Sequence, residues 1–189
     1  MITDNQNVSK EEQAGQETAR VNSDRETGAP RTLEVVEFDL AEGRYAIDIN
    51  LVREIVEMVP ITPIPRAPHY ITGVINLRGE ITNIVNLTMH LHLPDQPVTE
   101  NQKIIVFTAE TVKGNNVGIV VDSVSSVTTV TPSQIKSSVS SDEGRRGKYV
   151  KAIISFAGDE SSEQHDGLVI WLDILKLFKD IESKQSPAA

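Results

Sequence analysis

The sequence contains no cysteine among its 189 residues, which excludes disulfide bonds and thiolate metal sites. It also has no run of about 18 continuous apolar residues, the length that a transmembrane helix needs. Its N-terminus lacks the basic stretch and the apolar stretch of a secretory signal peptide. Together these absences predict a cytoplasmic protein without direct membrane insertion.

Positive charge and aromatic side chains are both scarce. The net charge is −9, so the chain is a poor candidate for binding nucleic acid. The one basic cluster, GRRGK at residues 144–148, lies beside Asp142 and Glu143 in a Ser- and Gly-rich stretch, which we interpret as a solvated loop. Aromatic residues make up 4% of the chain, so a buried core must be mostly aliphatic.

The chain divides by composition into a tail and one domain. Residues 1–30 are polar and contain almost no large apolar side chains, so we expect a disordered acidic N-terminal tail. Residues 31–182 have the length of one ordinary domain. Residues 183–189 are expected to form a flexible C-terminus.

The first half of the domain combines two hairpins with one expected helix. Residues 32–49 predict a hairpin with Gly43 in its turn. In residues 50–58, NLVREIVEM, the apolar positions form a stripe that predicts about two helical turns, capped by Asp48 or Asn50. GVINLRGEITNIVNL, residues 73–87, predicts a second hairpin that turns at Arg78 and Gly79.

Between these elements, four prolines at positions 60, 63, 65 and 68 predict an extended edge or a loop. LTMHLHLP, residues 87–94, fits either a short helix or a strand end. Residues 103–172 contain further short strands separated by polar turns. Residues 173–184 predict an amphipathic helix with Asp173 as its cap. Its expected apolar side consists of Ile174, Leu175, Leu177, Phe178 and Ile181.

Many short strands with closely spaced turns indicate an all-β sandwich or small barrels. Each half of the domain is small for an independent core. Two small barrels that share an interface would solve this problem.

Candidate catalytic or metal-binding groups are few. Ser133 and Lys136 match the pattern S-x-x-K, but four residues of this kind occur often by chance. His90 and His92 would share one face of a strand, as a metal site needs, yet the sequence shows no third ligand. We therefore favour a surface turn with two histidines.

Four carboxylates lie in or beside strand-like segments and are candidates for acid–base chemistry. They are Asp39, Asp48, Glu54 and Asp122. We favour the simpler interpretation, that each pairs with an arginine or with a turn amide.

The hairpin at residues 73–87 resembles the hallmark of the CheW family of chemotaxis coupling proteins, roughly G-V-x-N-L-R-G-x-I-x-P-V-x-D-L. Upstream, residues 45–79 are similar to the family's strand, its I-x-x-V-x-E-I segment and its proline-bearing segment. Downstream, VGIVVDSVSSV and DGLVIWLDILKLF are similar to later segments of the family. The resemblance covers residues 33–180. Asn83 and Asn86 replace the usual Pro and Asp of the hairpin, and Asn in these places can stand at an edge or cap a turn.

This resemblance implies an all-β fold of two SH3-like five-stranded barrel subdomains that share an apolar core, with short helices and a C-terminal helix. It implies a non-catalytic chemotaxis adaptor, without cofactor or metal. Its partners would be the cytoplasmic tips of methyl-accepting chemoreceptors and the regulatory domain of the histidine kinase CheA, joined in signalling arrays.

The resemblance also implies a receptor-binding groove between the barrels. Carried over by position, its residues are Val52, Glu54, Arg78, Gly118, Val124 and Val127. Gly118 would permit close backbone packing there. Arg78 would pair with Glu54, projected from the short helix, at the rim of the groove.

Two alternatives stay open. The first is a CheW-like adaptor of a pilus-type or other chemosensory system. The second, from another class, is a metal-dependent or small-ligand-binding β-barrel protein that uses His90, His92 and nearby carboxylates.

Overall fold

The computed structural model describes residues 32–94, 97, 99–112, 115–136, 147–156 and 167–183, all within the compact unit Arg31–Ala189. The expected tail of residues 1–30 lies outside the described residues. So do residues 184–189 of the expected C-terminus and residues 144–146 of the basic cluster.

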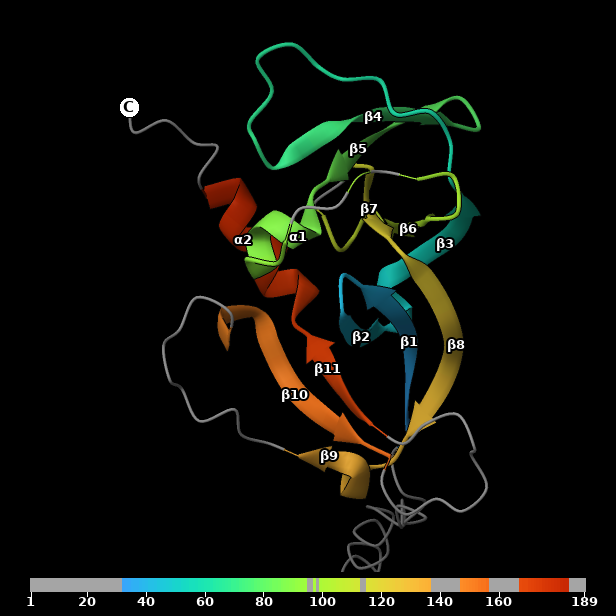
Figure 1. The fold of residues 1–189 in the computed structure, drawn as a ribbon, viewed down its shortest axis with the longest axis vertical. Helices are drawn as coiled ribbons and strands as arrows, with labels where there is room; N and C mark the ends of the chain where they lie inside the picture. The colour runs from blue at the N-terminus through green and yellow to red at the C-terminus, as the bar shows by residue number, and fades with distance from the viewer. Residues whose placement is uncertain are drawn as a thin grey trace, which may run out of the picture. The chain divides into compact units, whose positions relative to one another are not determined.

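The described elements are mainly strands (Figure 1). In the first half they are β1 (Leu33–Leu40), β2 (Gly43–Asp48), the 3-10 helix η1 (Ile49–Leu51), β3 (Val52–Glu57), β4 (Ile71–Leu77), β5 (Glu80–Val85) and α1 (Leu87–Leu91). The second half contains β6 (Lys103–Phe107), β7 (Val117–Val121), β8 (Ser123–Val130), η2 (Pro132–Gln134), β9 (Ile135–Lys136), η3 (Gly147–Tyr149), β10 (Val150–Ser155), β11 (Leu168–Leu172) and α2 (Ile174–Ser183).

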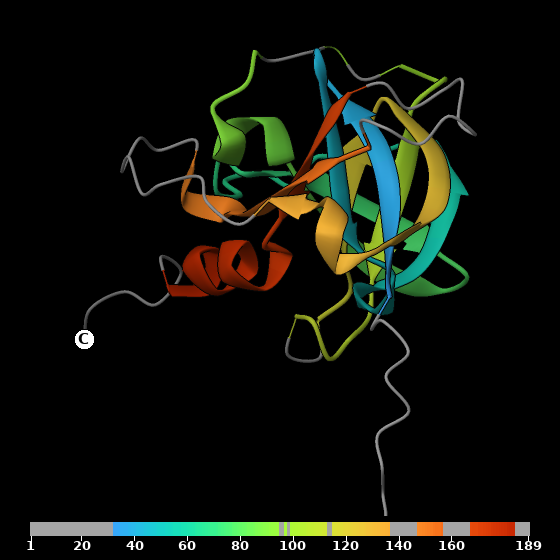
Figure 2. The same cartoon turned by 90° about the horizontal axis from the view of Figure 1, so that it is seen from below.

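The strands form two sheets, which confirms the expected all-β fold with two subdomains. The five-stranded sheet has the order β3-β6-β7-β5-β4, as expected. The other sheet has six strands rather than the expected five, in the order β8-β1-β2-β11-β10-β9, because the two-residue strand β9 pairs with the edge of β10. Strands β7 and β8 follow each other directly and belong to different sheets, so the chain crosses between the sheets at Asp122 (Figures 1 and 2). The closure of each sheet into an SH3-like barrel stays a prediction.

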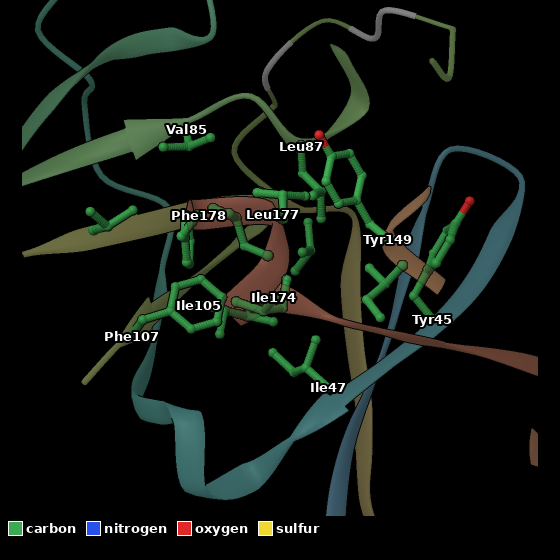
Figure 3. Packing of buried hydrophobic residues seen from close by; sticks show 14 of the residues in the cluster. Tyr45, Ile47, Val85, Leu87, Ile105, Phe107, Tyr149, Ile174, Leu177 and Phe178 are labelled. Atoms are coloured by element: carbon green, nitrogen blue, oxygen red, sulfur yellow. The ribbon is translucent and has the colours of Figure 1, made fainter. Parts of the chain in front are cut away.

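One large apolar cluster is shared by both sheets and by helices α1 and α2 (Figure 3). It contains Phe38 and Ile47 from the six-stranded sheet, Ile105 and Phe107 from the five-stranded sheet, and Phe178 from α2. Because successive strand residues point to opposite faces, each sheet also buries a second, smaller cluster on its other face. The expected shared apolar core is therefore present, and two local cores flank it.

Strand β6 shows why this sequence is apolar at consecutive positions. Ile105 and Phe107 belong to the shared core, while Ile104 and Val106 belong to the smaller core of the five-stranded sheet. All four are fully buried. A strand covered on both faces needs a continuous apolar run rather than an alternating one.

The prediction of a helix at residues 50–58 is wrong. A short 3-10 helix, capped by Asp48, is followed by strand β3, which pairs antiparallel with β6. The register shifts between Val52 and Glu54, as a β-bulge does. The bulge interrupts the alternation of apolar and polar residues, and the resulting pattern imitates a helical stripe.

Two smaller expectations also change. Gly43 is the first residue of β2 rather than a turn residue, and Ala41 takes the positive φ of 54° in that turn. In α2, Asp173 accepts a hydrogen bond from the Lys176 amide at 2.9 Å and so caps the helix as expected. Leu175, however, is 51% exposed and does not belong to the buried face.

The proline-rich segment covers the outer edge of β4, as expected for a chain that cannot form a central strand. Thr62 pairs with Val74 through two backbone hydrogen bonds of 2.8 and 2.9 Å. A Cβ atom added at Gly73 would lie 2.4 Å from the Thr62 carbonyl oxygen, so only glycine permits this close approach. The segment thus protects an exposed sheet edge from pairing with other chains.

Candidate functional site

The hairpin of β4 and β5 turns at Arg78 and Gly79, as the sequence predicted. Both residues have positive φ, 54° and 90°, which is the conformation of a type I′ turn. The Asn76 side chain accepts a hydrogen bond from the Gly79 amide at 2.8 Å. The turn therefore holds the Arg78 side chain at the tip of the hairpin, where it is 75% exposed.

The predicted pair of Arg78 and Glu54 is present. Arg78 Nη2 lies 2.9 Å from Glu54 Oε2, and the Glu54 side chain is 15% exposed. The contact is an ion pair that lacks the alignment of a hydrogen bond. Glu54 projects from strand β3, and not from a helix as expected.

Two further charged residues extend this pair into a four-charge network of Arg53, Glu54, Arg78 and Glu80. Arg53 Nε lies 3.4 Å from Glu54 Oε1, and Arg53 Nη1 donates to Glu80 Oε2 at 2.6 Å. The hydrogen bond to Glu80, and then the charge of that carboxylate, raise the pKa of Arg53 above its ordinary value. Positive and negative groups therefore alternate along the network.

Glu54 and Gly118 lie in one row across the five-stranded sheet, because Glu54 is paired with Val106 and Val106 with Gly118. Gly118 is buried. A Cβ atom on Gly118 would lie 3.1 Å from Ile104 Cγ2 and 3.3 Å from Ile84 Cδ1. Gly118 therefore allows close packing inside the smaller core of this sheet.

Two of the three valines of the expected groove pack against the shared core. Val52 and Val124 are partly buried against it, and Val127 is 53% exposed. Val52 is paired with Phe107 and Glu54 with Val106, two neighbouring residues that point to opposite faces of the sheet. The bulge at Arg53 thus turns Val52 toward the shared core and Glu54 toward the smaller one.

Strands β3 and β8 are edge strands of different sheets and pass close to each other in both views (Figures 1 and 2). We name this region the inter-sheet edge and define it by Val52, Ile55, Val124 and Val127. Ile55, which sequence reasoning missed, is 39% exposed on β3. The inter-sheet edge thus offers partly exposed aliphatic side chains, and the four-charge network begins on the same strand.

A pocket of about 570 Å³ lies elsewhere, between the proline-rich segment, β5, β7 and α2. Its lining includes Tyr70, Asn83, Val117, Phe178 and Ile181. None of the six expected groove residues lines it, and neither do the two candidate histidines.

The other candidate residues have structural contacts. Lys136 Nζ donates to the backbone carbonyl of Ser133 at 3.2 Å, while the Ser133 hydroxyl contacts Thr131. His90 lies in helix α1 and packs against Tyr70, with ring centroids 5.6 Å apart. His92 caps the end of that helix with a φ of 54°, so the two histidines do not share a strand face. Among the described residues, no three metal-ligating side chains gather.

The carboxylates pair as the simpler interpretation predicted. Asp48 accepts from the Asn50 amide at 2.9 Å, and Asp122 accepts from the Ala41 amide at 2.7 Å. Asp39 lies 3.8 Å from Arg44 and accepts from the Ser123 hydroxyl at 2.7 Å. Asn86, which replaces an Asp of the family pattern, caps α1 by accepting from the Met89 amide at 3.0 Å.

Within the described ranges, no helix is long and apolar enough to cross a membrane. The family model for the CheW-like domain matches residues 34–182. The chain is 32% identical to the chemotaxis protein CheW of Thermotoga maritima, over 83% of this chain and 95% of that protein. It is also 32% identical to that of Treponema pallidum, over 79% and 84%.

A solved structure, the scaffolding protein TtCheW of Thermoanaerobacter tengcongensis, matches with a TM-score of 0.61 and 27% identity. The match covers 76% of this chain and 89% of that one. Sequence and fold thus agree over nearly all of the part that the structure describes. The chain belongs to the CheW-like family.

Proposed function

We propose that this protein is a non-catalytic cytoplasmic adaptor that couples methyl-accepting chemoreceptors to the histidine kinase CheA. Family membership, and the match to a solved scaffolding protein, support a scaffolding role in chemotaxis. The observation that carries the finer proposal is the Arg78–Glu54 pair, 2.9 Å apart, in which Glu54 lies on β3, a strand that also forms the inter-sheet edge.

The receptor segment would be an amphipathic helix from the receptor tip. Its apolar side chains would cover Val52, Val124 and Val127, which together offer an aliphatic strip at the edge of the shared core. Arg78 is 75% exposed while its guanidinium also contacts Glu54, so it can donate further hydrogen bonds to a partner. Exposed ion pairs contribute only about 0 to 1 kcal/mol to stability, so the pair would serve mainly to orient Arg78.

Arg78→Ala tests the receptor contact. We expect the variant to fold normally and to bind a receptor cytoplasmic fragment more weakly, by about tenfold if one desolvated charged contact is lost. Affinity is measured by titration of purified protein, and circular dichroism reports the fold. Lys179→Ala, which removes an exposed positive charge from α2, is the matched control. Unchanged affinity in a folded Arg78→Ala variant would contradict the proposed contact.

The kinase contact is tested in the same preparation. A pull-down with the regulatory domain of CheA should recover the wild-type protein and the Arg78→Ala variant equally, because the two partners would use different surfaces. If the wild-type protein binds neither the receptor fragment nor the kinase domain, the adaptor proposal fails.

A further inference from the structure

The four-charge network joins parts of the five-stranded sheet that do not pair through their backbones. Strands β3 and β4 are the two edges in the order β3-β6-β7-β5-β4. Arg53 and Glu54 lie on β3, whereas Arg78 and Glu80 flank Gly79 at the tip of the β4–β5 hairpin. Edge strands β3 and β4 also contribute Val56 and Ile75 to the same smaller core. The sheet therefore curls until side chains of the hairpin tip reach the opposite edge.

The order of charges is complementary across this junction. Along the chain, the hairpin tip has the cation Arg78 before the anion Glu80, and β3 has the cation Arg53 before the anion Glu54. Each cation contacts the anion of the other segment: Arg53 contacts Glu80, and Arg78 contacts Glu54. Glu54 is shared, because Oε1 faces Arg53 at 3.4 Å and Oε2 faces Arg78 at 2.9 Å. The two arginines thus compete for a single carboxylate.

Glu80 decides this competition. Glu80 Oε2 accepts a 2.6 Å hydrogen bond from Arg53 Nη1. The contact between Arg53 and Glu54 is therefore made only by Nε, at the longer distance of 3.4 Å. Without Glu80, Arg53 would have Glu54 as its remaining carboxylate neighbour in the network. The family pattern given above specifies residues at positions 54 and 78 and leaves positions 53 and 80 open, so the resemblance assigns no role to Arg53 or Glu80.

We infer that Arg53 and Glu80 are positioning residues. Glu80 holds the Arg53 guanidinium so that only its Nε reaches Glu54 Oε1, at 3.4 Å, which leaves Glu54 Oε2 to orient Arg78. The consequence for receptor affinity rests on the proposed adaptor function. The arrangement of the four charges does not depend on that function.

The first test measures the coupling between Glu54 and Arg78 through urea unfolding of the full chain. Double-mutant cycles with Glu54→Gln and Arg78→Ala are made in three backgrounds: wild type, Glu80→Gln, and Arg53→Gln with Glu80→Gln. In the wild-type background, the unfolding constant of the double variant should differ by about two- to fivefold from the value expected if the two single substitutions were independent. This factor is the coupling between Glu54 and Arg78. Glu80→Gln should reduce this factor toward one, and adding Arg53→Gln should restore it.

A matched control is Glu57→Gln. Glu57 lies on β3, as Glu54 does, and its carboxylate pairs with Lys103 on β6. It should leave the Glu54–Arg78 coupling unchanged. The inference is overturned if the wild-type coupling factor is one, if it is equal in all three backgrounds, or if the double substitution fails to restore it.

The second test is affinity for the receptor fragment. Glu80→Gln should weaken receptor binding by the same factor by which it lowers the coupling between Glu54 and Arg78. Adding Arg53→Gln to that variant should restore the wild-type affinity. This recovery is not expected if Glu80 contacts the receptor itself. If the wild-type protein does not bind the fragment, the proposed function fails, and the coupling measurement still decides the inference.

Discussion

At the scale of single residues, the hairpin tip shows what a local pattern can specify. Gly79 follows Arg78 in a two-residue turn, and this spacing predicted the positive φ values that the structure has. The pairing of Arg78 with Glu54 came from the family resemblance, and the distance of 2.9 Å agrees with it. Arg53 and Glu80 were not assigned to the site from the sequence. The signal was available, because Arg53 stands next to Glu54 and Glu80 stands two residues after Arg78, each with the charge opposite to that of its neighbour.

Gly118→Ala should destabilise the fold by about 1–3 kcal/mol, because overpacking of a tight core forces neighbours to move. The added Cβ atom would meet Ile104 Cγ2 at 3.1 Å and the backbone oxygen of Ile105 at 3.3 Å. Urea unfolding measures the change. Gly167→Ala is the matched control, because nothing lies within 4 Å of its added Cβ atom. Equal stability of the two variants would refute the packing role of Gly118.

At the scale of elements, β3 and α2 illustrate opposite outcomes. The periodicity of α2 predicted its type, because its buried residues Ile174, Leu177, Phe178 and Ile181 share one face, and Asp173 at its start predicted its cap. In β3, the bulge at Arg53 shifted the alternation, and the short preceding 3-10 helix added apolar residues in sequence. Only the pairing with β6 distinguishes this segment from a helix.

Helix α2 contacts η3 through Asp180, which interacts with the side chains of Tyr149 and Lys148, two groups that titrate at alkaline pH. The Tyr149 hydroxyl donates to Asp180 Oδ2 at 3.0 Å, and Lys148 also pairs with that carboxylate. Burial, and then the nearby Asp180, raise the pKa of Tyr149, and the hydrogen bond to Asp180 raises the pKa of Lys148. The protonated forms are therefore favoured in the folded state.

The sign of the pH dependence follows from these two shifts. The stabilisation is complete below the unfolded-state pKa values of about 10 for Tyr and about 10.4 for Lys, and it is lost as pH rises through the higher folded-state values. Tyr149→Phe removes the tyrosine contribution, so its melting temperature should fall less steeply than that of the wild type above about pH 10. Calorimetric scans across this range measure the slopes, and parallel slopes would contradict the assignment.

At the scale of the whole molecule, the two sheets depend on one core. Ile105 belongs to the five-stranded sheet and is fully buried in the shared cluster. Trp171, the single tryptophan of the chain, belongs to the separate cluster of the six-stranded sheet. Its fluorescence therefore reports on the sheet that does not contain Ile105.

Ile105→Ala should destabilise the protein by about 2–5 kcal/mol, the usual cost of a large cavity in a core. If the sheets unfold together, the Trp171 fluorescence transition moves to lower urea by the same amount as the circular dichroism transition. A fluorescence transition that stays in place, while the circular dichroism transition splits, would show that the sheets unfold independently.

The sequence by itself determined the strand-rich composition, the aliphatic cores, the capped C-terminal helix and the Arg78–Gly79 turn, because these depend on neighbours within a few residues along the chain. Tertiary structure alone decided which sheet edges meet, and so brought Arg53 within 2.6 Å of Glu80, 27 residues away. Strand order and the curling of a sheet are set by packing between distant segments, and local periodicity carries no record of them.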